Sequence, residues 1–227
     1  RAIRQRLAAV VAERWDVPPD EIVFAGGMLT ITQPPPTKVG QQTTFSRAVQ
    51  WLIEEGRDPT VTHHYHAPAT QPLGRGGDMH FAFGYSALAA QVAVDEQTGE
   101  VQVLRIVAAC DAGRAINPIG VLGQIEGGVV MGIGTALTEA YRIEEGVPQT
   151  RRWRDYRIPR IEQMPVIEAH IVEHPTAEGP YGAKGIGELP SIPVAPAICN
   201  AIYKATGVRL RELPVGVGEL GNRKTWD

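Results

Sequence analysis

A glycine-rich loop near the end of the chain carries the residue types best suited to chemistry. It reads Gly182-Ala-Lys-Gly-Ile-Gly-Glu188 and is predicted to run into a helix over 189–206. Backbone N–H groups of such a loop can approach a ligand closely because few side chains intervene, and a helix N-terminus favours an anion. Lys184 is followed by Gly185 rather than by Ser or Thr, which excludes a phosphate-binding P-loop.

Glu188 ends this loop and is the candidate catalytic residue. It lies between Gly187 and Leu189-Pro190, with few polar neighbours in sequence. Partial desolvation of a carboxylate makes it a stronger proton acceptor, and therefore a better general base. The alternative is a carboxylate that complements the dipole of the following helix.

A second segment, 120–134, has a helical pattern but contains six glycines. Each glycine costs up to about 1 kcal/mol relative to Ala in a helix interior. We therefore expect another backbone or a ligand to approach this helix closely. Gln124, which can both donate and accept hydrogen bonds, either satisfies neighbouring backbone groups in the core or contacts a cofactor.

Two further patterns are weaker. Extended backbone would place His64 and His66 on one side, but no carboxylate or cysteine lies near them in sequence, so a solvated or substrate-side loop is favoured over a metal site. No metal-ligating side chain is assigned. The segment 216–221 matches the dinucleotide-binding fingerprint, yet only six residues follow it, too few for the helix that this motif requires.

The elements that must position these residues alternate between hairpins and helices. Apolar periodicity, caps and turn residues predict helices over 3–17, 44–55, 119–141 and 189–206, and strands over 21–32 (a pair turning at Gly26-Gly27), 81–94, 101–109, 166–172 and 209–215, with a further hairpin at 144–146. This order favours an α+β fold, with mixed hairpin sheets and packed helices, over a doubly wound α/β fold.

Composition excludes several classes. Glycine and proline together make up 43 of 227 residues, about 19% against a usual ~12%, which argues against a coiled coil. The 43% apolar content argues against disorder. The net charge of −3 lacks the basic excess that is typical of nucleic-acid-binding proteins. Only Cys110 and Cys199 are present, which fits a reducing compartment and excludes a cysteine-ligated iron–sulfur cluster in this chain.

The chain start and the apolar runs bear on targeting. The longest weakly polar run, 127–137, is shorter than the ~18 residues that a membrane span needs, so no membrane span is expected. The chain begins with Arg1 and enters directly into a helical pattern. We therefore expect a fragment or a processed chain, whose targeting cannot be judged from its start.

Three motifs in order carry a resemblance to a known family: Asp111-Ala-Gly-Arg-Ala-Ile-Asn-Pro118, Gly123-Gln-Ile-Glu-Gly127 and the loop 182–188. Together they resemble the molybdenum hydroxylases, the family of xanthine dehydrogenase and aldehyde oxidase. The likeness runs from about Pro68 to Val215. It implies the C-terminal portion of a molybdenum cofactor-binding domain, with residues 1–60 as a partial α+β subdomain and linker and 61–227 as the C-terminal molybdopterin-binding subdomain.

The resemblance also implies roles for particular residues. Glu188 is then the general base, and the residues at the pterin cofactor are Gly123, Gln124, Gly182, Ala183, Lys184, Gly185, Ile186 and Gly187. The implied reaction hydroxylates an N-heteroaromatic (purine-like) or aldehyde substrate with water-derived oxygen. Many relatives have Pro-Pro after the glutamate where this chain has Leu189-Pro190, which leaves the substrate open.

Cofactors and partners follow from the same resemblance. The cofactor is molybdenum–molybdopterin, with its cytosine dinucleotide form left open, and FAD and [2Fe–2S] clusters are expected on other domains or subunits. Expected partners are the remaining part of the molybdenum subunit, iron–sulfur and flavin subunits or domains, and a small-molecule substrate, in a cytoplasmic oligomer without nucleic acid or membrane. Alone, the chain is expected to be inactive.

Two other classes of protein compete with this interpretation. The alternative is a non-catalytic assembly or binding module derived from the family, against which the intact Gln124, Lys184 and Glu188 argue. A hydrolase is disfavoured because no serine has the GxSxG context and no Ser/His/Asp set is indicated.

Overall fold

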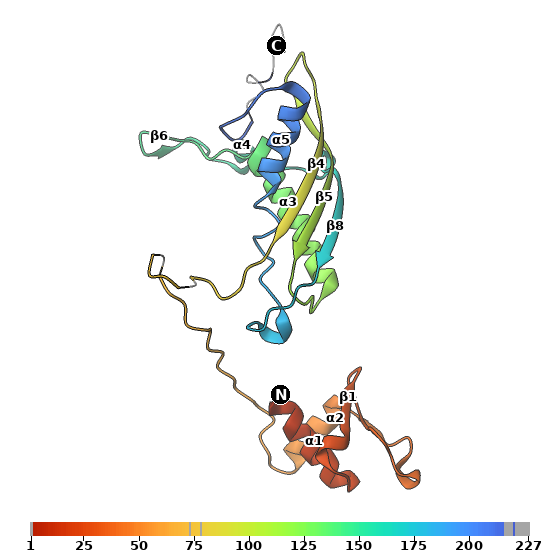
Figure 1. Ribbon diagram of the computed structural model, residues 1–227. Coiled ribbons are helices and arrows are strands. Elements are labelled where there is room, and N and C mark those ends of the chain that lie inside the picture. The colour runs from red at the N-terminus through yellow and green to blue at the C-terminus, as the bar shows by residue number, and fades with distance from the viewer. Residues whose placement is uncertain (1, 73, 78, 216–219, 221–227) are drawn as a thin grey trace. The chain divides into compact units, whose positions relative to one another are not determined.

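The chain forms two compact units, Arg1–His66 and Ala67–Asp227 (Figure 1). The computed structural model describes residues 2–72, 74–77, 79–215 and 220. The predicted domain boundary, between residues 60 and 61, lies six residues before the observed boundary between His66 and Ala67. Most of the fingerprint match over 216–221 lies outside the described residues.

The N-terminal unit combines two helices with a small antiparallel sheet of order β1-β2-β3. Its elements are α1 (Ala2–Trp15), β1 (Ile22–Ala25), β2 (Met28–Ile31), β3 (Gln42–Thr44) and α2 (Phe45–Glu54), with 3₁₀ turns at Pro19–Glu21 and Pro36–Lys38. Leu7, Leu29 and Leu52 are almost fully buried between them. β1 and β2 form the strand pair predicted over 21–32. The helix expected over 44–55 is α2, whose N-cap Thr44 accepts a hydrogen bond from the Arg47 N–H.

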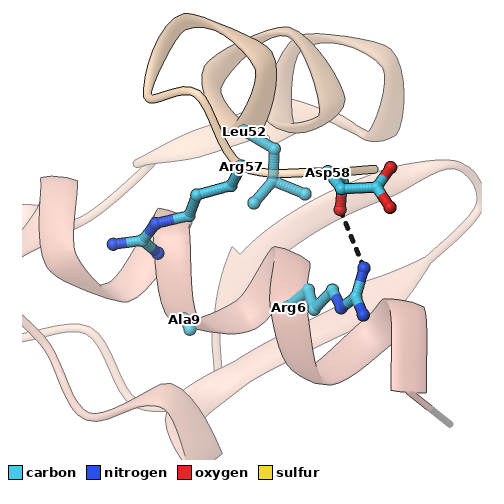
Figure 2. Close-up of a pocket in the computed structure, with 5 residues that line it drawn as sticks. All are labelled: Arg6, Ala9, Leu52, Arg57 and Asp58. Carbon is cyan, nitrogen blue, oxygen red and sulfur yellow. Dashed lines mark hydrogen bonds between the residues drawn. The ribbon is translucent and has the colours of Figure 1, made fainter. Parts of the chain in front are cut away.

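A cavity of about 370 Å³ lies in this unit between α1 and the segment after α2 (Figure 2). It is lined by Arg6, Ala9, Leu52, Arg57 and Asp58. Arg6 donates to the Asp58 carbonyl at 2.8 Å, and Arg57 pairs with Glu13 at 2.6 Å. Both arginines are thus paired within the unit, and none of the predicted site residues lines the cavity.

The C-terminal unit is built on a sheet of order β4-β5-β8, with α3 and α5 side by side on one face (Figure 1). The main elements are β4 (Ser86–Val94), β5 (Val101–Asp111), α3 (Pro118–Leu137), β8 (Val166–Val172) and α5 (Val194–Thr206). β4 and β5 form an antiparallel hairpin, whereas β8 runs parallel to β5 after the crossover through α3. The strand over 166–172 was predicted at the same residues, but its parallel pairing was not.

Shorter elements complete this unit. Between α3 and β8 lie β6 (Ile143–Glu144), β7 (Val147–Pro148), α4 (Trp153–Tyr156) and a 3₁₀ turn at Ile161–Gln163, and another 3₁₀ turn, Pro180–Gly182, opens the glycine loop. β6 and β7 form the predicted hairpin.

The core of this unit lies between the sheet and the two helices. β5 contributes alternate side chains, as its pleat requires, and the helices contribute one face each. The central buried residues are Ile106, Ala108, Cys110, Ile125, Val129, Ile133, Val194, Ile198 and Ile202. The ends of β5 and β8 and the α3–α5 contact, where the sequence motifs fall, therefore rest on a packed core.

α3 is the one helix in the described part of the chain that is long and apolar enough to cross a membrane by length and composition alone. The prediction of no membrane span rested on the run 127–137, whereas the helix extends over 20 residues. In the structure it contacts β5, β8 and α5. That is the arrangement of a core helix, which satisfies the same criteria of length and composition.

The predicted helix over 189–206 starts five residues late, at Val194. Leu189 and Ile192 each precede a proline, and the proline ring disfavours helical backbone at the residue before it. Residues 189–193 therefore form a turn, and α5 begins only after Pro193. Two other elements are also shorter than predicted, since the strand expected from 81 starts at Ser86 and the helix expected to 141 ends at Leu137.

The predicted strand over 209–215 is wrong, because the structure places no strand there. Pro214 has no N–H to donate to a neighbouring strand. The N–H of Val215 instead donates to the carbonyl of Ala136 at 2.8 Å. The segment thus packs on the C-terminal end of α3 and leaves the sheet with three strands.

The glycines of α3 fall into two groups. A Cβ on Gly132 would lie 2.3 Å from the Val194 Cβ, and one on Gly128 would lie 2.8 Å from the Pro190 Cβ. These two glycines allow the chain around the start of α5 to approach α3 closely. By contrast, no atom of another described element lies within 4 Å of a Cβ placed on Gly123 or Gly127.

Gly132→Ala should therefore destabilise the protein by about 1–3 kcal/mol, the usual cost of overpacking a filled site. Gly127→Ala is the matched control, and it should stabilise the protein by up to about 1 kcal/mol because alanine is the better helix former. Urea unfolding of the two variants measures the difference. Equal stabilities would contradict the assigned packing.

Candidate functional site

Two of the motifs meet in a short antiparallel bridge between residues 112–114 and 182–184. The N–H of Lys184 donates to the Ala112 carbonyl at 3.0 Å, and the N–H of Arg114 donates to the Gly182 carbonyl at 3.0 Å. The segment that follows β5 therefore holds the start of the glycine loop.

Glycine is required at the crossing point of these two segments. Gly113 has a φ of +64°, and a Cβ at this position would lie 2.3 Å from the carbonyl oxygen of Gly182. An L side chain would clash there and would strain the backbone. The close approach of the two backbones thus depends on Gly113.

A buried ion pair joins the same segments through their side chains. Lys184 Nζ lies 2.6 Å from Asp111 Oδ2, and the two side chains are only 7% and 4% exposed. The N–H of Gly113 donates to the other carboxylate oxygen of Asp111 at 2.8 Å. The paired lysine is the one that the family resemblance placed at the cofactor.

The pKa of the Asp111 carboxyl lies below its ordinary value. Burial alone would raise this pKa, because it disfavours the charged form. Hydrogen bonds from Lys184 and from the backbone N–H groups of Gly113 and His174, together with the lysine charge, outweigh burial. The aspartate is therefore held ionised in the folded protein.

The other end of the glycine loop is fixed at the start of β4. The side chain of Leu189 packs on Gly84, where a Cβ would lie 3.0 Å from Leu189 Cδ2, and Ser86 Oγ donates to the Leu189 carbonyl at 3.4 Å. Ser86 pairs with Cys110 in the sheet, and the N–H of Asp111 donates to the Tyr85 carbonyl at 2.8 Å. Both ends of the loop are therefore attached to neighbouring positions of one sheet edge.

Glu188 lies between these two attachments with its side chain exposed. Its carbonyl accepts hydrogen bonds from the N–H of Ser191 at 3.0 Å and from Ser191 Oγ at 2.8 Å. α5 starts at Val194 and has no acidic residue in its first turn. The alternative role for Glu188, as a carboxylate in the first turn of that helix, is thus not what the structure shows.

Gln124 lies on the same line of α3 as the two closely packed glycines. Residues 124, 128 and 132 are spaced by four and so share one helix face. Pro190 packs at Gly128 and Val194 at Gly132, whereas Gln124, one turn earlier, is exposed. The interpretation of Gln124 as a buried core amide is therefore wrong for this chain, and its side chain lies just beyond the α3–α5 contact.

Three glycines of the predicted site, Gly123 on α3 and Gly185 and Gly187 in the loop, have open space at the Cβ position, and Gly127 on α3 has the same property. Among the described residues, no atom lies within 4 Å of a Cβ at these positions, apart from the neighbouring residues and, on α3, the helix's own backbone. Ala183 and Ile186 are half-buried, and Ile186 packs on the core. The chain's own packing thus explains Gly128 and Gly132 but not these four glycines.

Two other features contain none of the predicted site residues. His63, His64 and His66 are exposed in a segment without helix or strand, and no group of three His, Cys, Asp or Glu able to hold a metal occurs among residues 2–72, 74–77, 79–215 and 220. A cavity of about 510 Å³ opens at the ends of β5 and β8. It is lined by Arg114, Ala115, Pro118, Ile171, Glu173 and Pro175, none of which was a predicted site residue.

Sequence reasoning assigned no role to Asp111 or Gly113, although both lie in a motif that carried the resemblance. A signal was present, since an aspartate at the end of an apolar strand is followed two residues later by glycine, and the glycine loop contains a single lysine. The pairing itself could not be read, because Asp111 and Lys184 are 73 residues apart in the chain.

Comparison with known proteins identifies the class. A family model for the molybdopterin cofactor-binding domain matches residues 1–165. The chain therefore belongs to this family of cofactor-binding domains, within the molybdenum hydroxylases and dehydrogenases, and the predicted resemblance is confirmed.

Particular relatives support this assignment. The chain is 41% identical over 135 residues to one of the subunits of the nicotinate dehydrogenase of Pseudomonas putida, covering 60% of this chain and 11% of the relative. It is 30% identical over 229 residues to the gamma subunit of the 6-hydroxypseudooxynicotine dehydrogenase complex of Paenarthrobacter nicotinovorans, covering 98% of this chain and 27% of the relative. The chain thus spans about a quarter or less of these relatives.

A solved structure agrees with the fold. The crystal structure of the aldehyde oxidoreductase from Desulfovibrio desulfuricans matches with a TM-score of 0.64 and 35% sequence identity, covering 73% of this chain and 18% of that chain. The predicted fold class, an α+β portion of a molybdenum cofactor-binding domain, is confirmed.

Asp111→Asn should lower stability in a pH-dependent way. Breaking a buried pair by removing one charge costs about 3–5 kcal/mol. Since the folded-state pKa of Asp111 is lowered, this contribution is fully present above the ordinary carboxyl value of about 3.9 and is lost as the pH falls through the folded-state pKa. Urea midpoints of wild type and variant between pH 7 and pH 3 should converge on acidification. A constant difference would contradict the assigned ion pair.

Proposed function

We propose that this chain is the part of a molybdenum-dependent hydroxylase that holds one side of the pterin cofactor and supplies the general base, Glu188. The observation that carries the proposal is a single arrangement: an exposed glutamate on a loop fixed at both ends, beside glycines whose Cβ positions are open. Membership of the cofactor-binding family supports it.

The residues present fit the cofactor. Gly185 and Gly187 leave the loop backbone uncovered, and Gly123 and Gly127 do the same on α3, so a flat ligand can lie against backbone without meeting side chains. Gln124, next to the open glycines, can donate to and accept from a pterin edge. When bound, the cofactor supplies the two-electron redox chemistry of the reaction.

The contribution of each loop residue differs. Gly182, Ala183 and Lys184 are tied to the segment after β5, and the lysine ammonium is already paired with Asp111. We therefore assign contact with the cofactor to the backbone of Lys184, Gly185, Ile186 and Gly187 rather than to the lysine charge. Glu188 then accepts, on a carboxylate oxygen, the proton of the water-derived oxygen that attacks the substrate carbon, for which it must stand within about 3 Å of that oxygen.

The substrate class is an electron-poor carbon in an N-heteroaromatic ring or an aldehyde. The names of the relatives support this range, since one is a nicotinate dehydrogenase and another is an aldehyde oxidoreductase. Both carbons are attacked by an oxygen nucleophile, which a general base activates.

Partner subunits are part of the proposal. Two relatives are named as subunits of larger enzymes. Cys110 and Cys199 are both unpaired, and two cysteines cannot supply the four thiolates of a cysteine-ligated iron–sulfur cluster. We therefore place the clusters and the flavin on other subunits or domains, in a cytoplasmic enzyme, and leave open whether the cofactor carries the cytosine dinucleotide.

Glu188→Gln in the complete enzyme should keep molybdenum and pterin but lower turnover per bound molybdenum by about 10²–10⁴-fold, the usual contribution of a general base. Glu145→Gln, at the exposed tip of the β6–β7 hairpin, is the control and should leave turnover unchanged. Unchanged turnover in Glu188→Gln would reject the base. A wild-type enzyme without molybdenum and pterin would reject cofactor binding and favour an assembly module.

Gly185→Leu should reduce the molybdenum and pterin content of the purified enzyme, and its unfolding midpoint should fall only as far as removal of the cofactor lowers that of the wild type, because a bound cofactor stabilises the folded state. Apart from the neighbouring residues, no atom of the described residues lies within 4 Å of a Cβ at position 185, so the side chain is added in the open space that we assign to the cofactor. Ala93→Leu adds the same side chain at an exposed position of β4 and should leave the cofactor content unchanged. Full cofactor content in Gly185→Leu would place the cofactor elsewhere.

A further inference from the structure

The loop that carries Glu188 depends on its two ends for its position. Between Lys184 and Glu188 lie Gly185, Ile186 and Gly187, and the two glycines have no side chains with which to hold the loop. Ile186 makes the contact with the core in this stretch. Ser191 donates two hydrogen bonds to the Glu188 carbonyl, so the place of the carboxylate is set by these local contacts together with the attachments at the two ends of the loop.

The attachment near Lys184 is the stronger of the two. It combines the ion pair at 2.6 Å with the backbone hydrogen bond from Lys184 to Ala112 at 3.0 Å. The attachment at Leu189 consists of its packing on Gly84 and one hydrogen bond of 3.4 Å from Ser86. Charge-assisted hydrogen bonds are roughly twice as strong as neutral ones, and exclusion of water strengthens the pair further.

We propose that Asp111 and Lys184 act together as a positioning pair for Glu188, which fixes the glycine loop to the end of β5 at the distance from the cofactor that proton transfer requires. This inference rests on the proposed function. Neither side chain touches the substrate. Asp111 acts through Lys184, and Lys184 acts through the loop backbone.

Both attachments of the loop lie on paired strands at one end of the sheet. Asp111 is the last residue of β5, and Ser86, which binds Leu189, is the first residue of β4. The two strands are paired at that edge, since Ser86 lies opposite Cys110 and the N–H of Asp111 donates to Tyr85. Loss of the ion pair leaves the backbone bonds between 112–114 and 182–184 as the hold on this end of the loop, so we expect the loosening to fall on Lys184 to Glu188 while the paired strands stay in place.

The test uses the complete enzyme and the variants Asp111→Asn, Lys184→Met and the double variant. Hydrogen exchange of the peptide covering 182–189 is the readout that needs no activity, and it should become faster in both single variants while exchange in α3 and α1 stays unchanged. Turnover per bound molybdenum should fall about 10- to 100-fold, the scale expected for a misplaced reacting group. KM should not change, because Glu188 accepts its proton in the transition state and the pair does not contact the substrate.

The double variant separates a pair from two independent contacts. If the residues act as one unit, the double variant is no worse than either single variant. If each residue contacts the cofactor separately, the losses multiply, and the proposal is overturned. Unchanged loop exchange, or unchanged turnover per molybdenum in a loosened loop, also overturns it.

The matched control is Glu168→Gln, which breaks the exposed pair between Arg105 and Glu168 on β5 and β8. It should change neither loop exchange nor turnover. Lys184→Arg keeps the charge and should retain most of the activity that Lys184→Met loses, so it tests the proposal even where Asp111→Asn does not fold. An equal loss of turnover in Lys184→Arg and Lys184→Met overturns the proposal.

The proposed function and the positioning role fail differently. A wild-type enzyme that lacks molybdenum and pterin overturns the proposed function, whatever the loop exchange shows. A wild-type enzyme that holds the cofactor, but in which the positioning variants keep full turnover per molybdenum, overturns the positioning role alone.

Discussion

The geometry of the candidate site depends on one buried ion pair, Lys184 with Asp111. Removing two charges from water costs several kcal/mol per ion, and an apolar pair of similar volume is often equally or more stable. The value of such a pair therefore lies mainly in the geometry that it requires. Backbone N–H groups of Gly113 and His174 donate hydrogen bonds to the Asp111 carboxylate and fix its position. The ion pair therefore fixes the position of Lys184 and of the glycine loop that carries it.

The glycines of this chain serve two physical purposes. Gly113, Gly128 and Gly132 allow parts of the chain to approach one another, because a Cβ at each would lie under 3.0 Å from another atom. Gly123, Gly127, Gly185 and Gly187 have no such neighbours, although the two in α3 cost helix stability. The first group explains how the site is assembled, and the second marks the surface that the chain leaves uncovered.

Local sequence signals predicted most helices and strands. They did not predict pairings that depend on residues distant in the chain. The β4–β5 hairpin and the start of α3 at Asn117-Pro118 follow from turn and cap residues, and both are present. The parallel pairing of β8 with β5 depends on a crossover that periodicity does not reveal. The late start of α5 is a local failure, since Pro190 and Pro193 were visible but were given less weight than the apolar pattern.

The candidate site shows the same division. The motifs named the glycine loop, Gln124 and Glu188, because glycine runs and isolated polar residues stand out in sequence. The roles of Asp111 and Ser86 come only from contacts across 73 and 103 residues of chain. The sequence left open whether Gln124 is a core amide or a cofactor contact, and the structure shows its side chain exposed.

The exposure of Glu188 fits the proposal that this chain supplies the general base while other groups shield it from water. A general base works best in a site from which bulk water is excluded, because electrostatic interactions with the reacting groups are weaker in water. The chain holds the loop of Glu188 through contacts at its two ends. It leaves the Cβ positions of the open glycines uncovered. On the proposed function, a side chain there would shield the carboxylate but would occupy the space that we assign to the cofactor. The proposal therefore requires that the cofactor, the substrate and the polypeptide that encloses them supply the shielding.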